Sequence, residues 1–164
     1  VNIDHPEDVG ADRMVNSIAG WHQYRCDQII VDFGTAITFD CVTNKCEYLG
    51  GVIFPGIGIS MEALSSRTAK LPHIDISEPP DRVIGKDTVK AMKSGVMNGF
   101  GSLIDGMVDK LKIEMGGDPD KIKVIATGGM AKVISSFTTR LDTVDQELTL
   151  KGLNIIYQTM YSND

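Results

Sequence analysis

The sequence of 164 residues contains few of the side chains that form disulfide bonds or bind transition metals. It has three cysteines and three histidines, and no cysteine pair has the Cys-x-x-Cys spacing of a zinc site. An odd number of cysteines without a visible secretion signal favours reduced thiols and a cytoplasmic location. Cys41 and Cys46 flank a predicted hairpin turn and could face each other, although free thiols are the favoured interpretation.

The sequence also lacks an excess of positive charge and any long apolar segment. Lys and Arg number 16 against 22 Asp and Glu, which gives a net charge of −6. Because binding to a phosphate backbone needs clustered cations, this balance argues against a nucleic-acid partner. No apolar run is long enough for a transmembrane helix, so no membrane partner is expected. The hydrophobic fraction of 42% is ordinary for a globular core.

A Walker A loop is absent, because no glycine-rich loop ends in Gly-Lys-Ser or Gly-Lys-Thr. A different pattern occupies residues 31–40, where an apolar run is followed by Asp32, Gly34 and Thr35 before apolar alternation resumes. It predicts two antiparallel strands whose turn presents an acid, a glycine amide and a hydroxyl. Turn amides bind anions, and a nearby acid can hold a cation. We therefore favour functional roles for Asp32 and Thr35 over a solvated strand end and a turn hydroxyl.

The apolar periodicity predicts an α/β chain. Helices are expected over 11–24, 57–67, 88–115, 130–139 and 150–161, and strands over 28–33, 36–43, 47–53, 123–126 and 142–144. This order resembles a ribonuclease H-like lobe of the actin-like ATPase superfamily, which includes acetate and sugar kinases, Hsp70 and actin. We expect a mixed sheet with a three-strand antiparallel meander flanked by helices. Glycines inside the long helix, Gly95, Gly99 and Gly101, indicate close packing of another helix.

The segment Gly10-Ala11-Asp12-Arg13 opens the first predicted helix and carries two charges that could act on a substrate. A carboxylate at Asp12 can accept a proton from an alcohol, and the Arg13 guanidinium can bind a carboxylate with two hydrogen bonds. A structural interpretation is equally open, because the helix dipole alone favours an acid in the first turn. Asp40, on the second predicted strand, suits structural pairing as well as function.

Three other segments are interpreted from their position along the chain. Thr127-Gly128-Gly129 joins a predicted strand to a helix and would place backbone amides where a phosphate or ribose can bind. Alone this motif is weak, but it is expected to face the same edge of the sheet as the Asp32 turn. Asp87 or Thr88 is expected to cap the long helix. The glycines of Gly50-Gly51 suit close packing between helix and sheet.

Together these motifs resemble those of type III pantothenate kinase, also known as the Bvg-accessory-factor-like family. The resemblance runs through Pro6, Gly10–Arg13, Asp32–Ala36, Gly50-Gly51, Pro55-Gly56, Thr68–Pro72, Gly85–Thr88, Thr127–Gly129 and Leu148–Leu153. Each motif is weak alone, but the ordered set is specific. The resemblance implies ATP-dependent phosphorylation of pantothenate to 4′-phosphopantothenate, the first step of coenzyme A biosynthesis. It also implies a cytoplasmic homodimer that uses ATP with Mg²⁺ and a monovalent cation, K⁺ or NH₄⁺.

The resemblance also implies roles for individual residues. Asp12 would be the catalytic proton acceptor, and Asp32 would coordinate the monovalent cation. The residues implied in pantothenate binding are Gly10, Ala11, Asp12, Arg13 and, from the partner subunit, Thr88. The residues implied in ATP binding are Gly34, Thr35, Thr127, Gly128 and Gly129.

Two departures from the family pattern matter. The family begins with a first lobe that carries an Asp-x-Gly-Asn-Thr phosphate loop, which this sequence does not contain. Residues 1–27 are therefore expected to be the end of that lobe and the interlobe helix, and residues 28–164 the C-terminal lobe. Without the first lobe, this chain is expected to be inactive alone. Ile3 stands where an aromatic residue often contacts pantothenate, so the pocket is expected to differ there. Two alternatives remain, another actin-like small-molecule kinase and a non-catalytic regulatory homologue.

Overall fold

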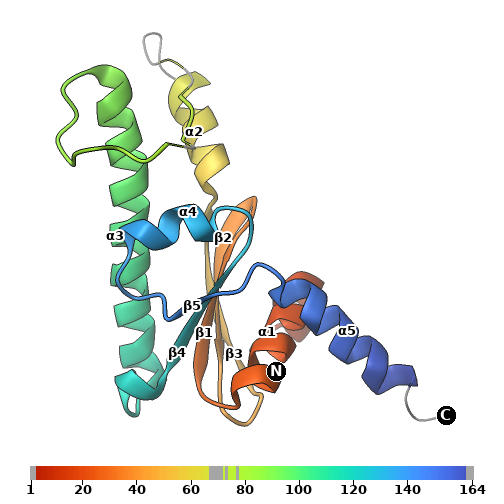
Figure 1. Cartoon of the computed structure of the whole chain (residues 1–164). Coiled ribbons are helices and arrows are strands. Elements are labelled where there is room, and N and C mark those ends of the chain that lie inside the picture. Colours follow the sequence, from red (N-terminus) through yellow and green to blue (C-terminus); the bar gives the residue numbers. More distant parts are fainter. Residues whose placement is uncertain (1–2, 67–71, 73, 77, 162–164) are drawn as a thin grey trace.

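A five-stranded mixed sheet forms the centre of the computed structural model, which describes residues 3–66, 72, 74–76 and 78–161 (Figure 1). The strands are β1 (Gln28–Phe33), β2 (Ala36–Val42), β3 (Tyr48–Pro55), β4 (Lys123–Thr127) and β5 (Thr143–Val144). Their order is β3-β2-β1-β4-β5. The first three strands form an antiparallel meander, and β4 and β5 add parallel to β1, which confirms the expected mixed sheet.

Helices cover both faces of this sheet (Figure 1). One face carries α1 (Ala11–Tyr24) and α5 (Leu148–Tyr161), which pack on each other. The other carries α3 (Thr88–Met115) and α4 (Ala131–Ile134), and α2 (Ile57–Ser66) extends beyond the sheet beside α3. Short 3₁₀ turns lie at Pro6–Asp8, Pro119–Lys121 and Ser135–Phe137.

The alternation of side chains along β1 decides which residues face which helices. The β1 side chains that pack on the α3 side are Ile29, Val31 and Phe33. Ile30 packs on the α1 and α5 side, so Asp32, two positions further on, falls on that side as well. The register pairs Asp32 with Thr38 of β2 and with Thr127 of β4. A polar row therefore crosses three strands beneath α1.

The long helix α3 has the bounds that its apolar periodicity predicts. Asp87 caps it by accepting a hydrogen bond from the backbone N–H of Lys90 (2.8 Å), which decides between the two expected caps. The helix ends at Met115 and is capped by Gly116, whose φ of 74° suits a residue without a β-carbon. Of the three internal glycines expected to contact another helix, Gly101 meets the 3₁₀ turn at Phe137, where a β-carbon would collide with the carbonyl oxygen. No described atom lies within 4 Å of a β-carbon placed on Gly95 or Gly99, so the expected contact is not found there within one chain.

The helix predicted over residues 130–139 is shorter than expected. α4 ends at Ile134, and the chain continues as the 3₁₀ turn Ser135–Phe137. The close approach of Phe137 to Gly101 and the anchoring of the next residues to α3 explain why the helix does not continue. Tertiary packing here overrides local helical propensity.

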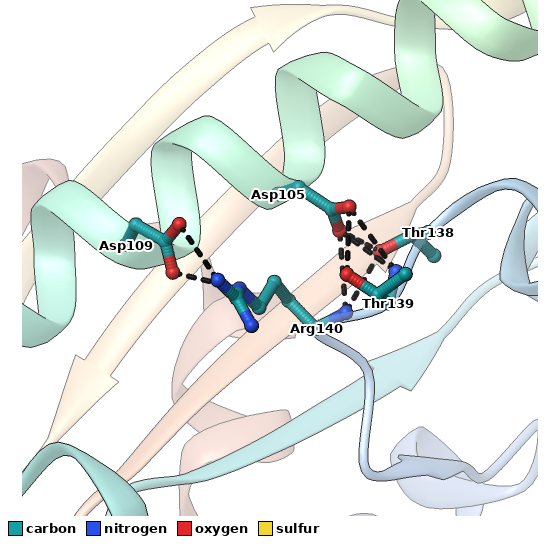
Figure 2. Close-up of polar contacts among 5 residues, drawn as sticks. All are labelled: Asp105, Asp109, Thr138, Thr139 and Arg140. Carbon is teal, nitrogen blue, oxygen red and sulfur yellow. Dashed lines mark hydrogen bonds and ion pairs between the residues drawn. The ribbon is translucent and has the colours of Figure 1, made fainter.

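Asp105, on α3, anchors the segment that leads into β5 (Figure 2). Its carboxylate accepts hydrogen bonds from the backbone N–H groups of Thr139 (3.0 Å) and Arg140 (3.2 Å). The hydroxyl groups of Thr138 and Thr139 donate to the same carboxylate. The Arg140 guanidinium contacts Asp109, one turn further along α3, at 2.8 and 3.2 Å. We call these five residues the Asp105 clamp.

All three cysteines are free thiols, as the sequence favours. Cys41 is buried in β2, and burial raises the pKa of its thiol to about 12. Cys46 lies exposed in the hairpin turn at a φ of 62°. Residues 68–71 of the family-like segment Thr68–Pro72 lie outside the described residues. Within the described part of the chain, no helix is long and apolar enough to cross a membrane.

Candidate active site

The turn that carries Gly34 and Thr35 lies against the start of α2. The backbone N–H of Gly34 donates to the carbonyl of Ala36 (3.1 Å), which closes the turn between β1 and β2. The backbone N–H of Gly56 donates to the carbonyl of Thr35 (3.1 Å), and a β-carbon on Gly56 would collide with that carbonyl. A glycine at this position therefore lets the β3–α2 connection pass directly beside the predicted phosphate turn.

The Thr127-Gly128-Gly129 turn meets Asp32 at the same edge of the sheet, as the sequence predicts. Gly128 has a φ of 91°, and a β-carbon there would lie 2.5 Å from Oδ1 of Asp32 and 2.7 Å from the backbone of Phe33. Only glycine fits this approach. Because α4 has four residues, its dipole contributes little, so any anion here would depend on individual backbone N–H groups.

Asp12 lies exposed in the first turn of α1, with one carboxylate oxygen folded back over Gly10. Its charge reaches Asp32 on the neighbouring strand. Burial raises the pKa of Asp32 above its usual value, a hydrogen bond from Asn16 opposes the rise, and the negative charges of Asp12 and Asp40 add to it. Asp12 therefore adds negative charge beside Asp32 at this end of the sheet, and Asp40, two positions further along β2 and paired with Arg13, adds a smaller contribution.

Arg13 points into the protein and pairs with Asp40 of β2. Its Nε and Nη2 atoms both lie 2.7 Å from Oδ1 of Asp40, whose side chain is 0% exposed. Asp40 also accepts hydrogen bonds from the hydroxyls of Tyr48 (2.8 Å) and Thr38 (3.2 Å). Burial raises the pKa of Asp40, while these donors and the Arg13 charge lower it. Gly51 makes room for the pair, because a β-carbon there would lie 2.8 Å from Nη2.

This pairing gives Asp40 the structural role that the sequence left open. Asp40 takes two of the five guanidinium N–H groups of Arg13, whose side chain is 14% exposed. The predicted contact between Arg13 and pantothenate stays a prediction.

Asn16 belongs to the site, although the sequence interpretation did not include it. Its side chain is 1% exposed and its Nδ2 donates to Oδ2 of Asp32 (2.9 Å). The hydroxyl of Thr149, on α5, donates to Oδ1 of Asn16 (2.7 Å). One signal was available, because Asn16 follows Asp12 by four positions and therefore lies on the same side of α1.

Thr88 lies apart from the other predicted site residues. It begins α3, which packs on the opposite side of the sheet from α1. There it lines a groove of about 610 Å³ together with Ser60 and Leu64 of α2 and Met92 of α3. Within the described part of one chain, Thr88 and Asp12 therefore belong to different surfaces.

The carboxylate of Asp32 is an oxygen ligand, and oxygen ligands suit hard cations. The described residues contain no group of three or more His, Cys, Asp or Glu side chains that could hold a metal ion. Oδ1 of Asp32 lies beside the Gly128 turn and accepts no hydrogen bond from any described residue. One carboxylate oxygen of Asp32 is therefore left beside the Gly128 turn for contact with a cation.

Sequence comparison identifies the family. The family model described as type III pantothenate kinase matches residues 1–110. The chain belongs to the type III pantothenate kinase family. The motifs that carry the resemblance and lie within the matched residues include the Asp12-Arg13 segment, the Asp32 turn and Thr88.

Curated members of the family are about half identical to this chain. The type III pantothenate kinase of Desulfotalea psychrophila is 50% identical over 160 residues, which are 98% of this chain and 60% of that protein. The kinase of Citrifermentans bemidjiense is 51% identical over 158 residues, 96% of this chain and 61% of that protein. The kinase of Koribacter versatilis is 50% identical over 163 residues, which are 99% of this chain and 58% of that protein. The chain thus spans about 60% of the length of these relatives.

A solved structure supports the fold. A conserved Baf family protein of Campylobacter jejuni, described as a candidate transcriptional activator, superposes with a TM-score of 0.65 at 24% identity. The match covers 96% of this chain and 67% of that protein. At this level of identity the likeness concerns the arrangement of strands and helices.

Proposed function

We propose that the protein carrying this chain phosphorylates pantothenate to 4′-phosphopantothenate, with ATP as the phosphate donor, and so begins coenzyme A biosynthesis. The observation that carries the proposal is 50% identity to proteins named type III pantothenate kinase across 98% of this chain. The gathering of Asp12, Asp32 and Gly128 at one edge of the sheet supports it. Because the chain spans 60% of such a relative, the activity is that of the whole protein.

We further propose that residues 28–164 form a ribonuclease H-like lobe of the actin-like ATPase superfamily, and that residues 1–27 lead into it from another lobe. The strand order and the antiparallel meander followed by parallel strands support this assignment. In this arrangement the nucleotide would lie against the sheet edge that carries Asp32 and Gly128.

In the proposed reaction the primary hydroxyl of pantothenate attacks the γ-phosphate of ATP while Asp12 accepts the hydroxyl proton. Asp12 suits this role because it is exposed at the start of α1, and its charge reaches Asp32. Gly10, Ala11 and the remaining N–H groups of Arg13 would hold pantothenate. Catalysis of this kind depends mainly on positioning and charge stabilisation.

The ATP phosphates would contact Gly34 and Thr35 on one side and the Thr127–Gly129 turn on the other. Both turns carry glycines, and at Gly128 a β-carbon would collide with Asp32 and the backbone of Phe33, which supports close contact of this turn with an anion. Mg²⁺ would accompany ATP, and a monovalent cation, K⁺ or NH₄⁺, would bind at Asp32 and offset the phosphate charge.

A homodimer would explain the position of Thr88. This residue would contact pantothenate bound by the other subunit, because within one chain it lies on the surface opposite Asp12. Gly95 and Gly99 of α3 support the proposal, because no described atom lies within 4 Å of a β-carbon placed on either. A second copy could therefore approach the α3 backbone closely.

The assay that tests this function uses the product of the whole open reading frame. ADP release is measured with and without pantothenate, in K⁺ and in choline buffer. Turnover that needs both pantothenate and K⁺ is expected. ADP release that is stimulated by a sugar or by acetate, and not by pantothenate, would assign the protein to another actin-like kinase.

A non-catalytic regulatory role is the second candidate, because the structurally similar Campylobacter jejuni protein is described as a candidate transcriptional activator. The net charge of −6 weighs against direct contact with DNA. ATP and pantothenate binding without any turnover would favour this candidate over the kinase.

A further inference from the structure

A chain of hydrogen-bonded side chains links Asp32 to the C-terminal helix. Thr149, in the first turn of α5, donates from its hydroxyl to Oδ1 of Asn16 (2.7 Å). The Nδ2 of Asn16 donates to Oδ2 of Asp32 (2.9 Å). Asn16 is 1% exposed, so solvent does not compete for its amide. Three elements, α5, α1 and β1, are thereby joined at one carboxylate.

The chemistry of these groups fixes which group donates and which accepts in each of these two hydrogen bonds. An ionised carboxylate only accepts hydrogen bonds, so the amide of Asn16 must turn its nitrogen towards Asp32. In the reverse orientation two oxygens would face each other without a proton between them. The hydroxyl of Thr149 can donate, so it satisfies the amide oxygen in the orientation that Asp32 requires. Each link therefore supports the next.

The backbone holds the first link in place. α1 and α5 cross at Gly152, where a β-carbon would collide with the carbonyl oxygen of Val15. Gly152 follows Thr149 by three positions, and Val15 immediately precedes Asn16. The close crossing therefore fixes the distance between the Thr149 hydroxyl and the Asn16 amide. Asn16 then has little freedom to hydrogen-bond another partner.

We propose that Asn16 and Thr149 are positioning residues for Asp32. Together they hold one carboxylate oxygen, so that the other stays turned towards the Gly128 turn, where the monovalent cation of the proposed function would bind. The inference rests on that proposed function and extends it by giving α5 a part in the cation site. Two negative neighbours and burial raise the pKa of Asp32, so a donor that favours the charged carboxylate also supports cation binding.

The test compares three variants of the whole protein. Thr149→Val removes the hydroxyl at nearly constant shape, and Asn16→Ala removes the amide. The matched control is Thr159→Val, on the same helix, where the exposed threonine donates only to the carbonyl of Ile155 in its own helix (2.8 Å). The first measurement is the rise in Tm as KCl replaces choline chloride at constant ionic strength. The second is the K⁺ concentration that half-activates pantothenate-dependent ADP release.

Loss of groups that orient a metal ligand typically weakens metal binding about 10- to 100-fold. We expect a shift of that size in the half-saturating K⁺ for Asn16→Ala, a several-fold shift for Thr149→Val and no shift for Thr159→Val. If Asn16→Ala fails to fold, Thr149→Val decides the outcome, because it preserves side-chain volume.

Three results would overturn the proposal. They are an unchanged half-saturating K⁺ in folded Thr149→Val, an equal shift in Thr159→Val, and a wild-type Tm that does not respond to K⁺. In the last case, ADP release in the same preparation separates the two ideas. Pantothenate-dependent turnover would leave the kinase assignment standing without this cation site, and its absence would remove both.

Discussion

Asp105 and Asp32 are both aspartates on regular elements, but the fold surrounds them differently. Asp105 accepts hydrogen bonds from backbone and side-chain donors of Thr138, Thr139 and Arg140 (Figure 2). Asp32 accepts one side-chain hydrogen bond from the described residues, that of Asn16, and has two further acids nearby. A carboxylate with so many donors is committed to structure, whereas Asp32 keeps an oxygen and an uncompensated charge for a ligand.

Asp40 shows that burial alone does not explain the difference. It lies deeper than Asp32, yet it receives the Arg13 guanidinium and the hydroxyls of Tyr48 and Thr38. Its charge is therefore compensated within the protein. Of the three carboxylates, Asp32 is the one that folding leaves partly open, and substitutions can separate the three cases.

The largest effect on stability is expected when the ion pair between Arg13 and Asp40 is broken. Arg13→Met leaves Asp40 buried without its cation, which typically costs about 3–5 kcal/mol of unfolding free energy. The double variant Arg13→Met/Asp40→Leu should recover much of this loss, because it removes the uncompensated charge. Urea unfolding of the single and double variants measures both values. A single variant as stable as the wild type would show that the pair contributes little.

Removing the centre of the Asp105 clamp should cost less. Asp105→Ala leaves the N–H groups of Thr139 and Arg140 and two hydroxyls without their acceptor, and we expect a loss of about 1–3 kcal/mol. Water can replace part of these contacts because the clamp is half-exposed. Chemical denaturation gives the free energy, and K⁺ activation should stay unchanged. A changed K⁺ response in Asp105→Ala would contradict the assignment of a structural role to Asp105 and a ligand-binding role to Asp32.

Asp32→Asn should raise the unfolding free energy, in contrast to the two substitutions above. It keeps the shape and the acceptor for Asn16 but removes a partly buried charge from between two acids, so we expect a gain of about 1 kcal/mol in unfolding free energy. The expected cost is functional, the loss of the Tm response to K⁺. Thermal and urea unfolding in choline buffer measure the first quantity, and KCl titration measures the second. A clear loss of stability would mean that the carboxylate is structural after all.

The stability difference between Asp32→Asn and wild type should depend on pH. Because the folded protein raises the pKa of Asp32, its folded state holds the proton more tightly than its unfolded state. Stability contributed by this group is therefore present below its ordinary pKa of 3.8 and falls as pH rises through the raised value. The advantage of Asp32→Asn over wild type, measured without K⁺, should be smallest near pH 4 and grow above it. An advantage that shrinks with rising pH would reverse the assigned direction.

The smallest effect is expected at the outer part of the clamp. Asp109→Asn weakens an ion pair whose two side chains are each 48% exposed, and such pairs are screened by solvent. The unfolding midpoint should stay close to that of wild type and become even less distinguishable in 1 M salt. A decrease comparable to that of Asp105→Ala would show that the ion pair, and not the Asp105 carboxylate, holds the segment.

Local signals in the sequence were enough to predict most of the fold. The bounds of α1, α3 and β1 follow from apolar periodicity and from Gly and Asp at the helix ends, because these signals act within a few residues. The helix predicted over residues 130–139 failed because its end is decided by Gly101 and Asp105 on another element.

The candidate site was predictable only in part. The motifs pointed to Asp12, Asp32 and the Gly128 turn, because acids and glycines next to the ends of elements can be recognised in the sequence. They did not predict that Arg13 binds Asp40, which is 27 positions away, or that Thr149 contacts Asn16 at a separation of 133. Such contacts depend on how α1 and α5 dock on the sheet, and no local pattern encodes that docking.

The most direct test of the account is pantothenate-dependent ADP release by the product of the whole open reading frame, compared between wild type and Asp32→Asn over a range of K⁺ concentrations. We predict that wild-type turnover requires both pantothenate and K⁺, and that Asp32→Asn folds but has lost the K⁺ response together with most of its turnover. A variant with wild-type turnover and an unchanged K⁺ response would contradict it.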